Sequence, residues 1–219
     1  MADSDRQRWD GRYASRDADA PLSDPDPWLR SLGALLPRTG RALDVAAGMG
    51  RHGLWLAERG FDVTLVDISP VGLDVARHRA TAAGLKVTTM QRDLDEGLPA
   101  GLWDLITCAH FLDRELYRAL PAALAPGGGL VIVHPTRRNL ERHPRPSARF
   151  LLDEGELLEL VEGLEMVRFE ECWSEGGRHE ARLFARRPPR SARENSPTGL
   201  GDSPERSDRG RPGTGRPTQ

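Results

Sequence analysis

The sequence predicts an α/β domain in which helices cover both faces of a doubly wound, mainly parallel β-sheet. Strand-like and helix-like segments alternate from Arg41 onward, which is typical of sheets built from crossover connections. A glycine-rich turn separates the first apolar strand from the helix that follows it. The last two strand-like segments are too close in sequence for a crossover, so we expect them to pair as an antiparallel hairpin.

The first half of this domain has clear helix boundaries. Gly60 and Gly84 are each expected to end a helix, because glycine adopts the left-handed C-terminal conformation easily. Ser69 followed by Pro70 is typical of an N-cap and a first helical position. The elements expected here are strands over 42–46, 61–66 and 86–91 and helices over 54–59 and 70–83.

The second half ends in the predicted hairpin. Asp113 is expected to cap a helix that stops before Pro121, where a separate short turn begins. The segment 126–128 is expected to form a turn into the fifth strand. Asp153 with Glu156 three residues later resembles a capping box. The elements expected here are strands over 103–108, 129–134, 165–172 and 180–186 and helices over 113–120 and 153–161.

Composition divides the chain into three parts. Residues 1–40 form an extension rich in Asp, Pro and Ser, whose first helices we expect to cover the substrate side of the domain at 41–187. Residues 188–219 contain only two aliphatic side chains, so they bury too little apolar surface to offset the entropy of ordering. We expect this tail to be disordered.

Charge and cysteine content favour a cytoplasmic protein without a nucleic-acid or membrane partner. The net charge is -2, which gives no electrostatic footprint for nucleic acid or an anionic membrane. Cys108 and Cys172 form no C-x-x-C pair, and no disulfide framework is expected. No signal peptide and no run long enough to span a membrane is visible. The sequence does not indicate an oligomeric state.

The turn after the first strand is the most informative segment. Gly48, Gly50 and Gly53 match the G-x-G-x-x-G spacing of dinucleotide sites, which favours an NAD-type ligand. Asp44 argues against that interpretation, because its carboxylate would repel a pyrophosphate. It suits instead the cationic methionine end of S-adenosylmethionine, directly or through water. The alternative is that Asp44 only accepts hydrogen bonds from the loop backbone.

Acidic residues follow the next two strands. Asp67 ends the second strand, where a carboxylate can accept hydrogen bonds from both ribose hydroxyls of NAD or S-adenosylmethionine. Its alternative role is to complement the charge of a helix N-terminus. Asp93 is a candidate acceptor for an adenine amine and Leu94 a candidate packing surface for the ring. Asp93 is otherwise a solvated loop acid.

Two histidines end later strands. His110 follows the fourth strand and His134 ends the fifth, where the reacting end of the ligand is expected. Each is a candidate general base or substrate-orienting group, and each is otherwise a structural hydrogen-bonding residue. No set of His, Cys or carboxylate residues has metal-ligand spacing, so no metal is expected.

The order of these motifs resembles that of the class I S-adenosylmethionine-dependent methyltransferases. The series is LDVAAGMG, LVDISP, QRDL, WDLITCAHFL and LAPGGGLVIVH, over about residues 40–135. The WDGRY segment at 9–13 and the FLLDEGELLEL segment are similar to a bacterial branch related to tellurite-resistance and thiopurine methyltransferases. The resemblance implies a Rossmann-like sheet of seven strands and S-adenosyl-L-methionine as cofactor.

The resemblance also implies site residues. Ala46 stands where the familiar first motif has glycine, and an extended backbone is expected there. The cofactor-binding residues implied are Asp44, Ala46, Gly48, Gly50, Arg51, Asp67, Ile68, Asp93, Leu94 and Cys108. The resemblance assigns no substrate residues; by their place in the chain the candidates are Trp9, Tyr13, Arg114 and Arg149, and the two aromatic residues are otherwise part of a satellite core.

The implied reaction is methyl transfer to a small-molecule acceptor, which is a thiol, a chalcogen oxyanion, an amine or a hydroxyl. The arginine-rich segment 137–149 is either a cover that recruits an anionic substrate or a solvated loop. Two alternatives stay open. One is an NAD-binding oxidoreductase that uses the glycine loop, and the other is a non-catalytic module that binds an adenosyl ligand.

Overall fold

The structure is a computed structural model that describes residues 2–16 and 24–189, so nearly all of the predicted tail lies outside the described residues. The strands are β1 (Gly40–Val45), β2 (Phe61–Asp67), β3 (Val87–Gln91), β4 (Trp103–Ala109), β5 (Leu124–Pro135), β6 (Glu165–Trp173) and β7 (His179–Arg186). The helices are α1 (Ala2–Ala14), α2 (Pro27–Ser31), α3 (Arg51–Glu58), α4 (Pro70–Ala82), α5 (Arg114–Ala123) and α6 (Glu156–Leu160). The 3-10 helices are η1 (Leu94–Glu96), η2 (Arg137–Glu141) and η3 (Ala148–Phe150).

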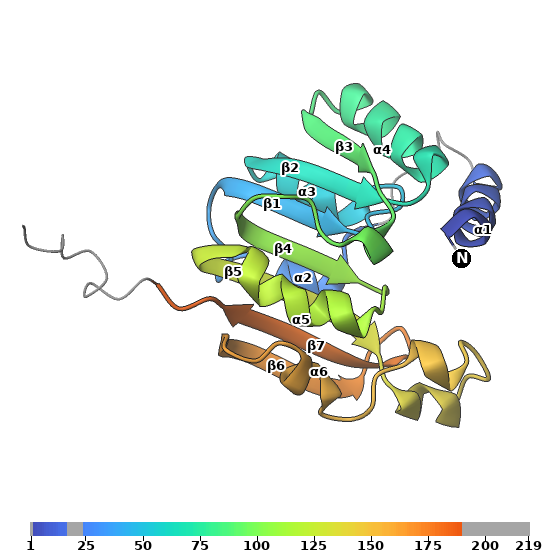
Figure 1. Ribbon diagram of the computed structural model, residues 1–219, viewed down its shortest axis with the longest axis vertical. Helices are drawn as coiled ribbons and strands as arrows, with labels where there is room; N and C mark the ends of the chain where they lie inside the picture. The colour runs from blue at the N-terminus through green and yellow to red at the C-terminus, as the bar shows by residue number, and fades with distance from the viewer. Residues whose placement is uncertain (1, 17–23, 190–219) are drawn as a thin grey trace, which may run out of the picture. The chain divides into compact units, whose positions relative to one another are not determined.

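The sheet confirms the predicted fold class. Its strand order is β3-β2-β1-β4-β5-β7-β6 (Figure 1). The first five strands are parallel, and β7 pairs antiparallel with both β5 and β6. The final hairpin is thus inserted with β7 beside β5. This order reverses direction between β1 and β4, which is the point where ligands bind in open α/β sheets.

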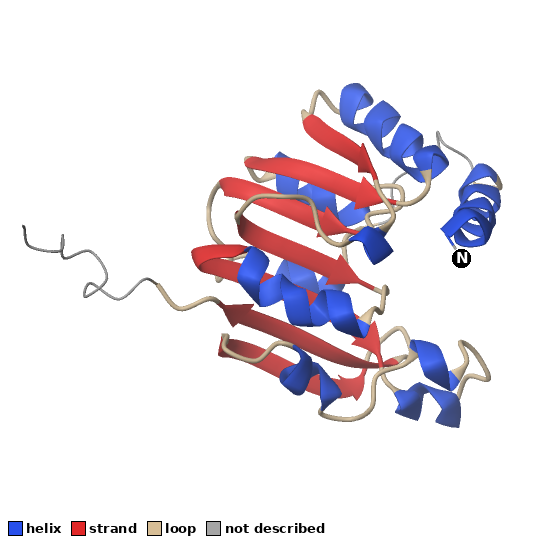
Figure 2. Cartoon of the chain, viewed as in Figure 1, coloured by secondary structure: helices blue, strands red, loops and turns tan. Residues whose placement is uncertain are grey.

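Both faces of the sheet are apolar, and successive side chains of a central strand point to opposite faces. In β5, Leu130 and Ile132 pack with the α5 and α6 side, whereas Val131 and Val133 pack with the α2 and α3 side. Helices therefore cover both faces (Figure 2). Within the described residues no helix combines the length and the apolar character that a membrane crossing needs.

Four expected boundaries are wrong. Helix α3 begins at Arg51, three residues before its expected start. Helix α5 continues through Pro121 to Ala123 because the neighbouring turn is held by fully buried leucines. The segment 126–128 belongs to β5, because the Gly127 amide donates a hydrogen bond to the Arg187 carbonyl at 2.9 Å and extends the pairing. Helix α6 begins at Glu156, after Gly155, and not at 153. Of the expected capping box only one half forms: the Glu156 carboxylate accepts a hydrogen bond from the Asp153 amide at 2.8 Å, whereas the Asp153 carboxylate pairs with Arg137 at 2.9 Å.

The N-terminal region contributes two distinct helices. Trp28 and Leu29 of α2 are buried in the core, and the Asp26 side chain caps this helix by accepting a hydrogen bond from the Trp28 amide. Helix α1 packs against the start of α4, where Asp10 and the Ser69 hydroxyl are 2.5 Å apart. Of these two N-terminal helices, α1 is the one that lies near the carboxyl ends of the strands, where we expected a cover for the substrate side (Figure 1).

Candidate active site

Asp67 joins the end of β2 to the loop that follows β1. Its Oδ2 accepts a hydrogen bond from the Gly48 amide at 2.8 Å, and its Oδ1 accepts one from the Ser69 amide at 2.9 Å. Burial raises the pKa of Asp67, and the hydrogen bonds from backbone amides oppose that rise. Each carboxylate oxygen has a second lone pair, so Asp67 retains the capacity to accept two ligand hydroxyls.

Asp44 lies beneath the same loop. Its Oδ2 accepts a hydrogen bond from the Gly53 amide and its Oδ1 one from the Thr107 hydroxyl, both at 2.9 Å. Burial raises the pKa of Asp44 to about 7, although both hydrogen bonds favour the charged form. Asp44 therefore accepts a hydrogen bond from the loop backbone, which is the alternative role expected for it from the sequence. A contact of Asp44 with a ligand stays a prediction.

Ala46 departs from the extended conformation expected for it. Its φ is +53°, in the left-handed region that favours glycine. The backbone turns sharply here because the Ala47 amide bonds the Val66 carbonyl and the Gly50 amide then bonds the Ala47 carbonyl, each at 2.9 Å. The expectation of an extended Ala46 is therefore wrong, and the strain explains why glycine is the more familiar residue at this position.

Replacing Ala46 by glycine is expected to stabilise the fold by about 1 kcal/mol, because relief of the left-handed strain exceeds the added entropy of the unfolded chain. Chemical denaturation of Ala46→Gly and wild type measures the difference. Ala47→Gly is the matched control, since Ala47 has no positive φ, and it should lose stability. An Ala46→Gly variant less stable than wild type would contradict the strain.

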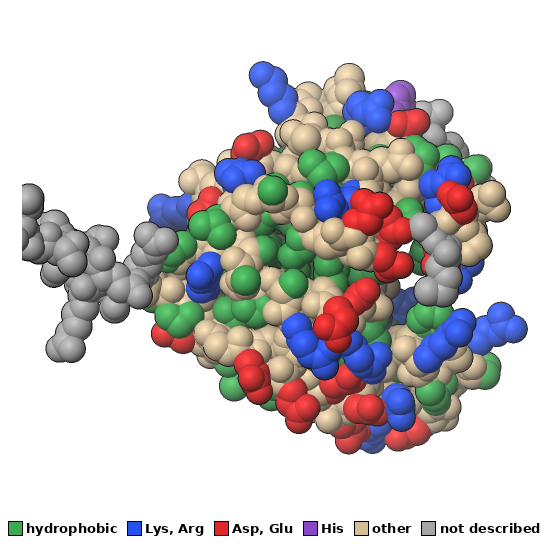
Figure 3. Space-filling model, viewed as in Figure 1, with side chains coloured by type: hydrophobic (Ala, Val, Ile, Leu, Met, Phe, Trp, Pro, Cys, Tyr) green, Lys and Arg blue, Asp and Glu red, His purple; other side chains and the backbone are tan. Residues whose placement is uncertain are grey.

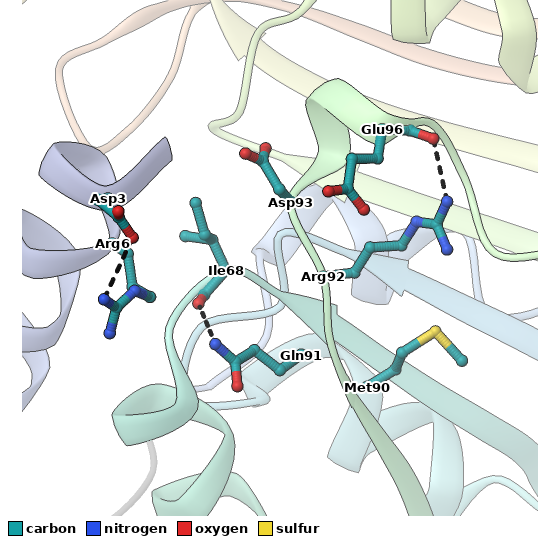
Figure 4. Close-up of a pocket in the computed structure, with 8 residues that line it drawn as sticks. All are labelled: Asp3, Arg6, Ile68, Met90, Gln91, Arg92, Asp93 and Glu96. Carbon is teal, nitrogen blue, oxygen red and sulfur yellow. Dashed lines mark hydrogen bonds and ion pairs between the residues drawn. The ribbon is translucent and has the colours of Figure 1, made fainter. Parts of the chain in front are cut away.

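A cavity of about 390 Å³ lies between α1 and the ends of β2 and β3 (Figure 4). Ile68 projects toward it, and Asp93 lies across from Arg6 of α1. One Asp93 oxygen accepts a hydrogen bond from the Asp95 amide at 3.0 Å, which leaves the other free for a ligand. Leu94 is buried in the core and does not line the cavity. The combination of an apolar side chain and a carboxylate suits an aromatic base with an amino group.

Tyr13 of α1 closes the other side of the loop. A Cβ added at Gly48 would lie 2.6 Å from the Tyr13 hydroxyl, so the ring rests directly on the glycine. Burial, and secondly the charge of Asp67, raises the pKa of Tyr13. Trp9 stacks on Tyr13 with ring centroids 5.6 Å apart. Tyr13 therefore lies over the glycine loop with Trp9 stacked on its ring, and substrate contacts of both aromatic residues stay predictions.

Two buried histidines, His52 and His134, and the partly buried His110 lie at this edge of the sheet. Burial lowers the pKa of His52 and of His110 to about 3 and that of His134 to about 4. His134 Nε2 donates a hydrogen bond to the Phe150 carbonyl at 2.9 Å. This is the structural role that was the alternative to catalysis for His134. Imidazoles with such pKa values are neutral at pH 7 and are weak bases. Sequence reasoning missed His52, whose only signal is its place just after the glycine loop.

The neutral state of His52 predicts acid sensitivity. The pKa of His52 is about 6.5 in the unfolded chain and about 3 in the folded one. The contribution of neutral His52 to the free energy of unfolding is therefore complete above pH 6.5 and is lost as pH falls toward 3. At pH 5 the loss is about 2 kcal/mol. His52→Gln should therefore lose less stability than wild type between pH 8 and pH 5, as measured by denaturation. The exposed His78, changed to Gln, is the control, and equal pH slopes for His52→Gln and wild type would contradict the assignment.

The remaining predicted residues are held by contacts within the protein. Arg114 forms a two-point ion pair with Glu156, at 2.5 and 2.9 Å, which joins α5 to α6. Arg149 lies over the Phe150 ring. Burial raises the pKa of the Cys108 thiol to about 12, so Cys108 is unreactive. The substrate contacts of Arg114 and Arg149 and the cofactor contact of Cys108 stay predictions.

The arginine-rich segment between β5 and α6 is likewise engaged locally. Arg137 and Arg138 pair with acidic side chains at 2.9 to 3.3 Å, and Arg142 lies 3.7 Å from the centroid of the Trp173 ring. Positive and negative side chains alternate over this part of the molecule (Figure 3). The contacts favour a packed surface segment over one that recruits anions.

Metal ligands are not assembled in the described part of the chain. Across residues 2–16 and 24–189, no group of three or more His, Cys, Asp or Glu side chains is placed to hold a metal ion.

Comparisons with known proteins agree with this geometry. Residues 42–128 match the family model described as a methyltransferase domain. A demethylmenaquinone methyltransferase of Thermus thermophilus is 38% identical over 122 residues, which are 50% of this chain and 50% of that protein. The chain thus spans about half the length of the curated relatives that it matches.

Solved structures share the fold over a longer stretch. TehB from Haemophilus influenzae has a TM-score of 0.60 at 23% identity, over 73% of this chain and 60% of that one. The N-methyltransferase NodS from Bradyrhizobium japonicum, solved with S-adenosyl-L-homocysteine, has a TM-score of 0.62 at 21% identity, over 84% and 98%. Residues 42–128 are thus similar to methyltransferase domains, and the chain shares the fold of solved S-adenosylmethionine-dependent methyltransferases.

Proposed function

We propose that this protein transfers a methyl group from S-adenosyl-L-methionine to a small-molecule acceptor. One observation carries the proposal. Asp67 is hydrogen-bonded to the glycine loop, and the residue that follows it, Ile68, lines a cavity together with Asp93. A carboxylate next to a cavity that combines the apolar side chains of Ile68 and Met90 with the Asp93 carboxylate fits the ribose and adenine of an adenosyl group. Asp67 would hold the ribose hydroxyls, and Asp93 and Ile68 would hold the base.

The loop amides favour this cofactor over a dinucleotide. A dinucleotide site needs free backbone N–H groups to hold a pyrophosphate. Here the Gly48 amide donates to Asp67 and the Gly53 amide donates to Asp44. Two carboxyl groups thus occupy the positions where a dianion would bind, which weighs against an NAD-dependent oxidoreductase.

The cofactor supplies an activated methyl group, so the protein has mainly to orient the two reactants and exclude water. Helix α1 supports this role, because Tyr13 covers the glycine loop and Asp10 fastens the helix to Ser69. The neutral histidines at the end of β4 and β5 would contact the acceptor.

An assay of S-adenosylhomocysteine release across thiol, amine, hydroxyl and oxyanion acceptors tests the proposal. We expect turnover with one of these classes. Cofactor binding with no turnover in any class would support the non-catalytic module instead. Binding of NAD(H), detected by energy transfer from tryptophan, would support the oxidoreductase.

A further inference from the structure

Unsatisfied nitrogen atoms gather at the end of β4. His52 Nε2, His110 Nδ1 and His134 Nδ1 are buried and have no hydrogen-bond partner among the described residues. Leaving one such atom unpaired costs about 1 to 3 kcal/mol, so three in one place indicate a site that a ligand completes. His110 also holds a φ of +59°, a strained conformation for a residue other than glycine.

Contacts bring these groups together from four elements. The His110 amide donates a hydrogen bond to the Val133 carbonyl of β5 at 2.9 Å. Val133 is the register partner of Arg182 in β7. His110 acts electrostatically on His52, at the start of α3, and His134 acts on His110. Four segments therefore converge here, namely the start of α3, the ends of β4 and β5, and β7 with the residue before it.

The surrounding charge is positive. Arg51, Arg178 and Arg182 all act electrostatically on His110. Arg182 is neutralised by Glu180, 2.9 Å away, whereas neither Arg51 nor Arg178 forms an ion pair within the described residues. Asp44, the carboxyl group that Arg51 faces on β1, is buried and hydrogen-bonded. Two guanidinium charges thus lack a carboxylate partner.

We infer that this cluster is the acceptor site and that it binds a small thiol or acidic hydroxyl compound as its anion. The inference rests on the proposed methyl transfer and names its acceptor class. Arg51 and Arg178 would favour the ionised acceptor, and the uncharged imidazoles of His52 and His110 would each donate an N–H hydrogen bond to it. His134 Nδ1 carries a lone pair, because the proton of this ring is on Nε2, so His134 lines the site without donating to the anion.

The reaction at such a site balances without a base. A lone pair of the anionic sulfur or oxygen forms the bond to the methyl carbon. The carbon–sulfur bond of the sulfonium breaks, and its electron pair stays on sulfur. One positive and one negative charge disappear together, and no proton is removed, which agrees with histidines that are neutral and weakly basic.

Binding of an inert anion tests the site without turnover. Protein saturated with S-adenosylhomocysteine is titrated calorimetrically with benzoate and with benzamide, its neutral isostere. We expect benzoate to bind and benzamide not to. Arg178→Gln should weaken benzoate binding about fivefold, as expected for one partly solvated charge, and Arg178→Lys should restore it. Arg118→Gln is the matched control, since Arg118 is exposed on α5 and paired with Glu115.

Turnover gives the second test. With para-substituted thiophenols at fixed pH, kcat/KM should rise with the ionised fraction, and the corresponding anilines should not be methylated. Failure of S-adenosylhomocysteine to bind would overturn the proposed function itself. With that binding intact, equal binding of benzoate and benzamide, anilines methylated as fast as thiophenols, or no thiophenol turnover would overturn the acceptor inference alone.

Discussion

Replacing Asp67 by alanine is expected to weaken binding of S-adenosylhomocysteine about 100-fold. Two charge-assisted hydrogen bonds to ribose, each contributing about 1.5 kcal/mol, account for this factor. The loop would also be disturbed, because the Gly48 and Ser69 amides lose their acceptor. Dissociation constants from calorimetry measure the effect, and thermal unfolding shows whether the variant remains folded.

Two further variants separate recognition from folding. Asp67→Asn keeps the size of the side chain but loses its charge, so it should bind the cofactor more weakly than wild type with a smaller loss of stability. Asp62→Asn changes an exposed carboxylate at the other end of β2 and should leave binding unaltered. An unchanged dissociation constant in folded Asp67→Ala would remove Asp67 from the cofactor site.

Replacing Gly53 by valine is expected to destabilise the fold by about 3 kcal/mol, through overpacking. A Cβ at this position would overlap the Cδ2 of Leu65, which is fully buried in β2, and would lie 3.1 Å from the Asp44 carboxylate. Glycine here lets α3 approach the sheet closely enough for the Gly53 amide to reach Asp44. Chemical denaturation gives the free energy of unfolding.

Gly11→Ala is the control for Gly53→Val. Gly11 also lies in a helix, but an added Cβ there would meet no atom within 4 Å. That change should be neutral or should stabilise the fold by up to about 1 kcal/mol through helix propensity. Equal stability of Gly53→Val and wild type would show that the close approach of α3 to β2 is not required.

Local patterns in the sequence predicted the framework of the site well. The strand ends that carry Asp44, Asp67 and Asp93 follow from apolar runs bounded by glycine or by a helix cap, and parallel pairing brings such ends to one edge. The Ser69 cap was also visible, because its hydroxyl accepts from an amide only three residues away.

Features that depend on distant contacts were not visible in the sequence. The Arg114–Glu156 pair joins residues 42 positions apart, so Arg114 looked free for a substrate. The left-handed Ala46 results from hydrogen bonds between β1, β2 and the loop, whereas alanine alone favours an extended or helical backbone. Burial of His52 depends on how α3 seats on the sheet, which no local pattern fixes.

A crystal structure of the protein grown with S-adenosylhomocysteine tests the central claim most directly. We predict that the adenine lies in the cavity beside Ile68 and Asp93 and that the ribose hydroxyls contact Asp67. We also predict that Tyr13 remains over the glycine loop. Adenosine bound away from Asp67, or no ligand at saturating concentration, would contradict the assignment of this edge of the sheet as the cofactor site.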